Sequence, residues 1–317
     1  MIRVGILGCA NIARRSLIPA FDVHSAFKVT GIASRDLGTA APLASRYACE
    51  ARTYEGLVTA DDVDLVYCPL PTGLHYAWVK RCLEAGKHVL CEKSLACTAA
   101  EVSELVALAR RQNRFLMESF QFRFHAQNLF VRRLLAEGAI GPLRQVVVRF
   151  GIPPFPEGRA NIRYSAALGG GALLDNGAYT IKATTYLLGK DVQVKAAHRV
   201  VPPDAEVDIH GTLSLETAQG VVSQTAYGFD HWYRNGYDIW GTKGTIATTR
   251  AFTARPDFDA EVRVETAEGV KIRTFRDDHF ARLLDYVADC IVTRNHEEEY
   301  EECLVQARLL QQAKELP

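Results

Sequence analysis

The chain has 317 residues with 37 basic and 37 acidic side chains, so its formal net charge is zero. That balance excludes the strong basic field that draws proteins to nucleic acid or anionic membranes, and no apolar stretch approaches the length of a transmembrane helix. The length predicts about two domains. Eight cysteines without a CxxC pair or zinc spacing predict no metal site and favour a reducing cytoplasm.

The first third of the sequence alternates short apolar runs with helical patterns. Strands are predicted at Ile2–Leu7, Phe27–Ala33, Asp64–Cys68, His88–Cys91 and Phe115–Met117. Helices are predicted at Ile12–Asp22, Thr39–Tyr47, Leu74–Glu84 and Ala99–Gln112. Short strands separated by helices are typical of parallel βαβ units, so we expect an α/β domain with a doubly wound parallel sheet of the Rossmann type.

The turn after the first strand is the strongest nucleotide-binding signal. The dinucleotide fingerprint has three glycines, and this chain has Gly8, Ala10 and Ala13 at those positions. Alanine still permits fairly close approach, and Asn11 and Ile12 open the following helix. Its backbone N–H groups are expected to bind a pyrophosphate, although an ordinary strand-to-helix turn is the alternative.

The end of the second strand predicts which dinucleotide binds. An NAD-binding chain usually has an acid here for the ribose 2′-hydroxyl, whereas this chain has Ser34 and Arg35. A hydroxyl and a guanidinium suit a 2′-phosphate, so we expect NADP(H) to be preferred, with NAD(H) possible. Asp36 stands one position late, and a helix-capping acid in a solvated turn is the alternative reading.

The turn after the third predicted strand contains two prolines, Pro69 and Pro71, followed by Thr72 at the start of a helix. Prolines stiffen a turn and remove backbone donors. We expect this loop to lie beneath the nicotinamide ribose of the cofactor. His75 is a candidate for cofactor binding, and packing in the first helical turn is equally plausible for it.

Glu92 and Lys93 follow the fourth predicted strand, at the same carboxyl edge of the sheet. Burying the charge of a lysine costs free energy unless the ammonium is paired or takes part in binding or catalysis. Lys93 is predicted to hold a substrate oxygen and to lower the pKa of a neighbouring phenol. Glu92 is predicted to pair with it or to hold a ribose, and an exposed salt bridge at the strand end is the alternative.

After about Ser119 the pattern changes to longer alternating strands. They are predicted at Leu143–Phe150, Val192–Val201, Asp208–Thr217, Val221–Tyr227, Arg234–Trp240, Gly244–Thr249 and Ala260–Glu265. Helices are predicted at Asn128–Glu137, Gly177–Leu188, His279–Thr293 and Glu301–Lys314. We therefore expect an NADP-binding domain of residues 1–119 and an α+β domain of residues 120–317, with a large, mainly antiparallel open sheet for substrate binding and oligomerisation.

Three consecutive glycines precede the most specific constellation of the second domain. Asp175 and Tyr179 follow Gly169–Gly171 and are four residues apart, so a helix would place both on one face. An acid and a phenol beside a lysine can exchange a proton with a carbonyl oxygen. A flexible loop before a core helix with a capping aspartate is the alternative.

Together these motifs resemble the family of glucose–fructose oxidoreductase, inositol dehydrogenase and rhizopine catabolism dehydrogenases (Gfo/Idh/MocA). The resemblance spans nearly the whole chain and rests on Gly8-Cys-Ala-Asn-Ile, Cys91-Glu-Lys-Ser-Leu, Phe122-Arg-Phe-His, Gly138-Ala-Ile-Gly and the segment Gly169–Tyr179. It implies a two-domain NAD(P)-dependent oxidoreductase acting on sugars, cyclitols or related alcohols. It maps the family's lysine onto Lys93 and its aspartate onto Asp175.

Two positions depart from the family pattern. Ser94 replaces the proline of the family's Glu-Lys-Pro, which puts the frequent cis bond there in doubt. Tyr179 replaces a common histidine, and this is similar to the branch of nucleotide-deoxysugar 3-ketoreductases and dihydrodiol or xylose dehydrogenases. The resemblance implies that Tyr179 donates the proton with Lys93 beside it. Arg123 and His125 are expected to line the same cleft, with Arg123 contacting the cofactor and a structural role for both as the alternative.

The predicted function is therefore NADP(H)-dependent hydride transfer to or from a sugar-type carbonyl, with a nucleotide-linked keto-deoxysugar favoured. A free aldose, a cyclitol or a cyclic trans-diol is the alternative substrate, and a catalytically silent NADP(H) sensor is the second alternative. The second domain has more sheet than one layer of helices covers, so we expect a homodimer or homotetramer built through it. No nucleic-acid or membrane partner is expected.

Overall fold

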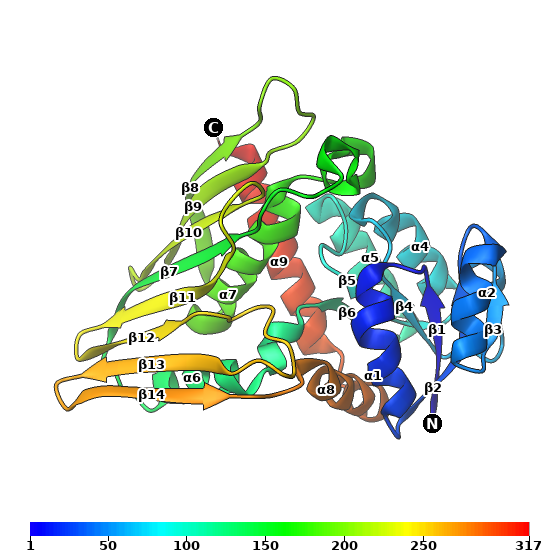
Figure 1. Ribbon diagram of the computed structural model, residues 1–317, viewed down its shortest axis with the longest axis horizontal. Helices are drawn as coiled ribbons and strands as arrows, with labels where there is room; N and C mark the ends of the chain where they lie inside the picture. Colours follow the sequence, from blue (N-terminus) through cyan, green and yellow to red (C-terminus); the bar gives the residue numbers. More distant parts are fainter. Residues whose placement is uncertain (317) are drawn as a thin grey trace. The chain divides into compact units, whose positions relative to one another are not determined.

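The computed structural model describes residues 1–316, which form two compact units, each built on its own sheet (Figure 1). The first unit consists of Met1–Ser119 and Phe280–Ala307. The second consists of Phe120–His279 and the chain from Arg308 onward. Within residues 1–316, no helix combines the length and apolar character that crossing a bilayer requires.

The sheet of the first unit has six parallel strands in the order β3-β2-β1-β4-β5-β6. The strands are β1 (Ile2–Leu7), β2 (Phe27–Ala33), β3 (Glu50–Arg52), β4 (Leu65–Cys68), β5 (His88–Glu92) and β6 (Leu116–Ser119). The order reverses between β1 and β4, and this is the switch point at which doubly wound sheets bind ligands. The predicted doubly wound parallel sheet is confirmed.

Helices connect these strands. They are η1 (Ala13–Leu17) with α1 (Ile18–Val23), α2 (Leu37–Arg46), α3 (Tyr54–Val58), α4 (Thr72–Glu84) and α5 (Ala99–Gln112). Thr98 caps α5 in a complete capping box with Glu101, for which the Thr-x-x-Glu spacing is typical. The short elements β3 and α3 were not predicted.

Two helices from the end of the chain complete the core of the first unit. They are α8 (His279–Thr293) and most of α9 (Glu297–Glu315). Tyr300, Cys303 and Ala307 are buried in the same apolar cluster as α4, α5 and the strands between them. The sequence-based division ended the first domain at residue 119, but apolar contacts place residues 280–307 with this unit as well.

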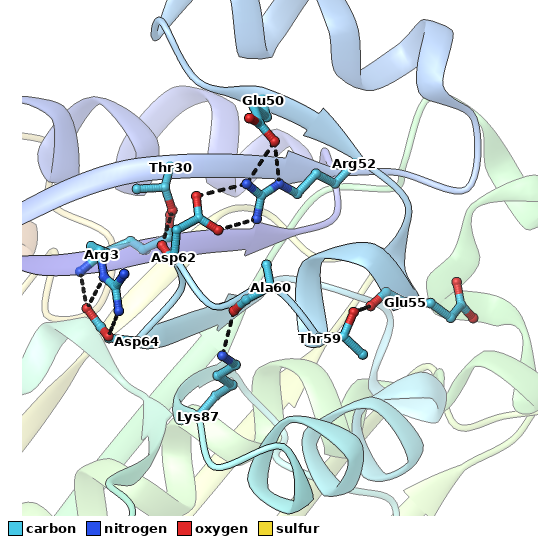
Figure 2. A network of polar contacts seen from close by, with 11 residues as sticks. Arg3, Thr30, Glu50, Arg52, Glu55, Thr59, Ala60, Asp62, Asp64 and Lys87 are labelled. Carbon is cyan, nitrogen blue, oxygen red and sulfur yellow. Dashed lines mark hydrogen bonds and ion pairs between the residues drawn. The ribbon is translucent and has the colours of Figure 1, made fainter.

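Charged side chains tie the turn before β4 to neighbouring strands of the first unit (Figure 2). Arg3 at the start of β1 binds Asp64 before β4, with nitrogen–oxygen distances of 2.9 and 2.6 Å. Arg52 binds Asp62 in the same two-pronged way, and the Lys87 ammonium donates to the carbonyl oxygen of Ala60 at 2.7 Å. The Arg3 and Lys87 contacts hold the amino ends of β1, β4 and β5, and Arg52, the last residue of β3, ties that edge strand to the turn before β4.

The sheet of the second unit has eight strands in the order β14-β13-β12-β11-β7-β10-β9-β8. The strands are β7 (Leu143–Gly151), β8 (Val192–Val200), β9 (His210–Thr217), β10 (Val222–Gly228), β11 (Arg234–Gly241), β12 (Gly244–Thr248), β13 (Ala260–Thr266) and β14 (Gly269–Phe275). Only the pairing of β7 with β10 is parallel, so the predicted mainly antiparallel sheet is confirmed.

Helix α7 (Ala178–Leu188) packs against one face of this sheet, continuing from the π-helical turn η6 (Leu173–Gly177). The hydroxyl groups of Thr184 on α7 and Ser223 on β10 lie 2.7 Å apart, both fully buried. The short helix η2 (Gln121–Phe124) leads into α6 (Ala126–Ala136), which contacts β13 and β14. The alternate side chains of the central strands are partly exposed, and they surround a shallow hollow of about 450 Å³.

Candidate active site

The turn after β1 has the geometry of a dinucleotide-binding turn. Gly8 has a φ of +123°, and a Cβ atom there would lie 2.9 Å from Leu70, so only glycine fits. Helical backbone begins at Asn11, with Asn11 and Ile12 exposed at its open end. Ala13 is fully buried, so its methyl group fits where the fingerprint has its third glycine. The alanines weaken the motif but do not block the turn.

Asp36, the acid in the second predicted cofactor segment, caps a helix. Its carboxylate accepts hydrogen bonds from the Gly38 amide at 2.9 Å and the Thr39 hydroxyl at 2.8 Å. These bonds, with that of Thr39 the larger, hold the pKa of Asp36 below its usual value. Both carboxylate oxygens therefore accept hydrogen bonds from α2. The Ser34 hydroxyl oxygen accepts a hydrogen bond from the Asp36 backbone amide at 3.3 Å.

Arg35 lies exposed beside the Tyr54 hydroxyl. Burial raises the pKa of that phenol, and the nearby Arg35 charge offsets part of the rise. The Tyr54 oxygen is also 3.9 Å from the position that a Cβ atom would take at Gly8. Tyr54 therefore lies between Arg35 and the Gly8 turn. The Arg35 guanidinium is thus close to the helix N-terminus that begins at Asn11.

His75 links the loops that follow β4 and β5. Its ring is fully buried, with Nε2 2.6 Å from the Leu70 carbonyl oxygen and Nδ1 2.8 Å from that of Ser94. Burial lowers the pKa of His75. Cys68 and Cys91 lie against the same ring, with the three candidate ligand atoms within 4.8 Å of one another. Because both ring nitrogens already face carbonyl oxygens, this arrangement favours the packing alternative for His75.

The other predicted residues of these loops lie at the carboxyl ends of β4 and β5. Pro69 and Pro71 flank Leu70, Pro71 occupies the N-cap position of α4, and α4 begins at Thr72. Glu92 accepts a hydrogen bond from the buried Tyr67 hydroxyl at 2.7 Å. The peptide bond between Lys93 and Ser94 is cis, which answers the question that the missing proline left open.

In the second unit, Asp175 is paired with an arginine. Arg163 Nε donates to Asp175 Oδ2 at 2.6 Å, and the carboxylate side chain is 16% exposed. The pairing raises the pKa of Arg163 above its usual value, chiefly through the charge of Asp175. The arginine belongs to the segment 152–171 between β7 and η6, which contains three short 3-10 turns.

Tyr179, one turn further along the same helix, is buried in an aromatic cluster. Its ring lies 5.2–6.0 Å, centroid to centroid, from four phenylalanine rings, those of Phe120, Phe122, Phe150 and Phe252. The Gln121 amide nitrogen donates to the Tyr179 hydroxyl at 3.2 Å. The phenol ring is thus fixed by packing, and its oxygen is held by a hydrogen bond.

Arg123 and His125 have structural contacts. His125 is fully buried and caps α6, with its Nδ1 accepting from the Gln127 amide at 3.2 Å. The Arg123 backbone carbonyl accepts from the Tyr186 hydroxyl at 3.0 Å, and its guanidinium lies 5.3 Å from the Phe124 ring centre. These contacts support the structural alternative for His125, and cofactor contact by Arg123 stays a prediction.

Sequence reasoning did not single out three residues that the structure brings to these sites: Tyr54, Gln121 and Arg163. Tyr54 lies in a helix too short to be predicted. Gln121 directly precedes the Phe122–His125 motif, so its position was a usable signal. Arg163 is one of two arginines in the segment before the glycines, and only the fold distinguishes it from Arg159.

Two family models match most of the chain. Residues 2–120 match the "Oxidoreductase family, NAD-binding Rossmann fold" model, and residues 129–247 match the "GFO/IDH/MocA C-terminal domain" model. A 3-reductase of Saccharopolyspora spinosa, named for dTDP-3,4-didehydro-2,6-dideoxy-alpha-D-glucose, is 42% identical over 83% of this chain and 79% of its own length. The chain belongs to the GFO/IDH/MocA oxidoreductase family.

Other members of the family are similar over nearly the full length. D-xylose 1-dehydrogenase (NADP(+)) 2 of Haloferax volcanii is 32% identical over 91% of this chain and 89% of its own length. A 3-ketoreductase of Actinomadura kijaniata, crystallised with NADP and TDP-benzene, is 38% identical, with a TM-score of 0.94 over 99% of this chain and 97% of its own. The predicted family and its tyrosine-bearing branch are confirmed.

Proposed function

We propose that this family member is an NADP(H)-dependent reductase of a nucleotide-linked keto-deoxysugar. The observation that carries the proposal is the environment of Tyr179, a buried phenol held by Gln121 and placed one helical turn from Asp175. A proton donor of this kind suits reduction of a carbonyl. The 42% identity to a dTDP-keto-deoxysugar 3-reductase supports the choice of substrate class.

The residues of the first unit fit NADP(H). Gly8, Ala10, Asn11 and Ile12 would hold the pyrophosphate at the open helix end. Ser34 and Arg35 would hold the 2′-phosphate, and the Asp36 carboxylate supports this preference because both of its oxygens accept hydrogen bonds from α2. When bound, the nicotinamide supplies the hydride.

The loops after β4 and β5 would support the nicotinamide end. Pro69, Pro71 and Thr72 would lie against the ribose, with His75 bracing the two loops from beneath through the Leu70 and Ser94 carbonyls. We propose a ribose contact for Glu92, whose carboxylate the Tyr67 hydroxyl orients. Arg123 would add a cofactor contact from the second unit.

Three side chains would carry the proton chemistry. Tyr179 would give its proton to the carbonyl oxygen as the ring carbon is reduced, and take it back in the reverse direction. Lys93 would stabilise the developing alkoxide and the tyrosinate by its positive charge. Asp175, oriented by Arg163, would bind substrate hydroxyl groups.

The test is an assay of the purified protein with matched substrates. The absorbance of NADPH is followed as it is consumed with a dTDP-linked 3-keto-2,6-dideoxysugar, and as it forms from NADP⁺ with D-xylose or with a cyclic trans-diol. Turnover of the keto-sugar at a kcat/KM far above that of the other two supports the proposal. Faster turnover of xylose, which the 32% identical dehydrogenase makes the second candidate, would replace it. Tight NADPH binding without turnover of any of them would leave a sensor.

We propose a cytoplasmic homodimer or homotetramer assembled through the exposed face of the eight-stranded sheet. That face carries Val147, Arg149 and Gln224 around the hollow and Trp240, which is 56% exposed, on β11. A partly apolar sheet face of this kind tends to pair with a second copy. Sedimentation at micromolar concentration should show a mass of two or four chains, and Trp240→Glu should lower it. A wild-type species of 35.1 kDa alone would refute the assembly.

A further inference from the structure

Arg163 is held from two sides within the second unit. Its Nε atom donates to Asp175 Oδ2 at 2.6 Å, and its guanidinium carbon lies 5.0 Å from the centre of the Phe155 ring. The side chain remains 41% exposed although its charge is paired. An arginine in this position is anchored, yet it faces a region that a ligand can reach.

The consecutive glycines fix the backbone of this arginine. The Gly171 amide donates to the Arg163 carbonyl oxygen at 2.9 Å, and a Cβ atom at Gly170 would lie 2.4 Å from that oxygen. The Asn161 side chain also accepts from the Arg163 amide at 3.1 Å. The glycines thus allow the backbone of residues 169–171 to approach the Arg163 carbonyl closely. This approach places the Arg163 side chain where it pairs with Asp175.

The guanidinium is also near the Tyr179 phenol. Asp175 and Tyr179 share one face of the helix, and the charge of Arg163 interacts first with Asp175 and more weakly with Tyr179. A carboxylate beside a phenol disfavours the tyrosinate, and a cation beside both favours it. The arginine therefore opposes the effect that the carboxylate has on the phenol.

We propose that Arg163 is a positioning residue of the active site, which holds the Asp175 carboxylate and balances its charge beside the Tyr179 phenol. This role rests on the proposed function, in which Tyr179 exchanges the proton. The structure assigns no step of the reaction to Arg163 itself. It acts through Asp175, which it orients, and through Tyr179, whose ionisation it favours.

Other groups also face Tyr179 within its unit. The segments packed on its ring contribute Phe120, Gln121, Phe122, Phe150 and Phe252, none of which is charged. Its own helix adds the buried Lys182, whose ammonium lies 5.3 Å from the Phe120 ring centre. Lys93, which the family motif assigns to the same chemistry, belongs to the first unit. Both lysines stay unchanged in the variants below.

The test is the pH dependence of Arg163→Gln. Removing the cation leaves the carboxylate beside the phenol, so the pKa of Tyr179 should rise by about one pH unit. Reduction needs the protonated phenol, so its alkaline limb should move to higher pH. Oxidation needs the phenolate, so its acid limb should move in the same direction. Arg163→Lys should restore part of the shift, and Asp175→Asn in the Arg163→Gln background should reverse it.

Arg159 provides a matched control within the same segment. Its guanidinium stacks on Tyr164 and pairs with Asp204 at 3.0 Å, so Arg159→Gln should leave both limbs where they are. A fall in kcat with unmoved limbs in Arg163→Gln and Arg163→Lys would show a merely structural arginine and overturn the proposal. If Arg163→Gln does not fold, two other variants test the proposal. Asp175→Asn should move the pH limbs to lower pH, and Arg163→Lys should move them slightly to higher pH. Unmoved limbs in both variants would overturn the proposal.

A spectroscopic readout separates this inference from the proposed function. The ultraviolet absorbance of tyrosinate is titrated in the wild type and in Tyr179→Phe, and the difference reports one phenol. The comparison is repeated between Arg163→Gln and the double variant Arg163→Gln/Tyr179→Phe. In that pair the Tyr179 phenol should titrate at higher pH than in the wild type. If no keto-sugar is reduced but the difference titration shifts, the proposed function fails and the charge coupling stands. If the enzyme is active and the titration does not shift, the inference fails alone.

Discussion

At Tyr179 the ring and the hydroxyl group have separate structural roles. The ring is packed among four phenylalanine side chains, whereas the oxygen is held by the polar Gln121 amide. Removing the oxygen therefore leaves most of the packing in place. The residue is suited to a substitution that tests chemistry without disturbing the fold.

Tyr179→Phe should lower kcat by roughly 10²- to 10⁴-fold because the proton donor is lost. NADPH affinity, measured by fluorescence titration, should be unchanged. Lys93→Ala should also lower kcat, and the double variant should lose less than the sum of the two because they act as a unit. A near-normal kcat in Tyr179→Phe, with activity abolished in His125→Ala, would assign the proton to the histidine instead.

Arg35 should distinguish the two dinucleotides. Arg35→Ala should weaken NADPH binding by about 1.5–3 kcal/mol, the usual value of a hydrogen bond to a charged group, and should leave NADH binding nearly unchanged. Fluorescence titration of both cofactors measures this. Arg46, the last residue of α2, stacks on Tyr47 and supplies a control, since Arg46→Ala should alter neither affinity. Equal affinities for NADPH and NADH in the wild type would contradict the assignment.

At the scale of elements, long regular segments were predictable and short or exposed ones were not. β1 and β2 were predicted to the residue because each is a buried apolar run ended by a turn. β14 was missed because its side chains are mostly exposed and carry no buried face to mark it. The predicted helix Glu301–Lys314 begins earlier, at Glu297, where three glutamates stabilise the helix N-terminus.

The candidate site was predictable where one motif carries it and not where separate segments meet. Gly8, Lys93, Asp175 and Tyr179 each stand in a recognisable local pattern. The pairing of Arg163 with Asp175 depends on how the segment 152–171 folds back, which no periodicity records. The helix-capping alternative for Asp36 was predictable from its place before a helix, and its contacts with Gly38 and Thr39 favour that alternative.

The segment 152–171 should respond to Gly170→Ala. The new methyl group would meet the Arg163 carbonyl oxygen at 2.4 Å, so the segment must shift and the arginine with it. We expect kcat to fall and the pH limbs to move as in Arg163→Gln. Gly158→Ala is the comparison, because that glycine has a φ of +55° but open space around it. It should cost about 1 kcal/mol of stability and leave the pH profile unmoved.

At the scale of the whole molecule, acid should weaken the fold through His88. Burial, followed by the charge of Arg114, lowers the pKa of His88 to about 4, and its Nδ1 accepts from the Phe115 amide at 2.9 Å. Between its ordinary value of about 6.5 and the lowered one, the unfolded chain binds a proton that the folded chain does not. The free energy of unfolding should therefore decrease as the pH falls through this window.

His88→Asn keeps an acceptor for the Phe115 amide and removes the titrating group. Urea unfolding at about pH 7 and about pH 5 should show a smaller loss of stability for this variant than for the wild type. The exposed His198 on β8 is the control, and His198→Asn should behave as the wild type does. Equal losses in the wild type and His88→Asn would exclude His88 as a source of the acid sensitivity.

The return of the chain to the first unit has a consequence for synthesis. A ribosome makes the chain from its N-terminus, so residues 1–119 emerge long before the helices that supply Tyr300, Cys303 and Ala307 to their core. Until then the nascent unit exposes the apolar surface that α9 later covers, and domains made early often fold as they emerge. This nucleotide-binding half instead completes its core with residues 297–307, which are translated only after the whole eight-stranded sheet, and a chain that stops before them leaves its first-made half unfinished.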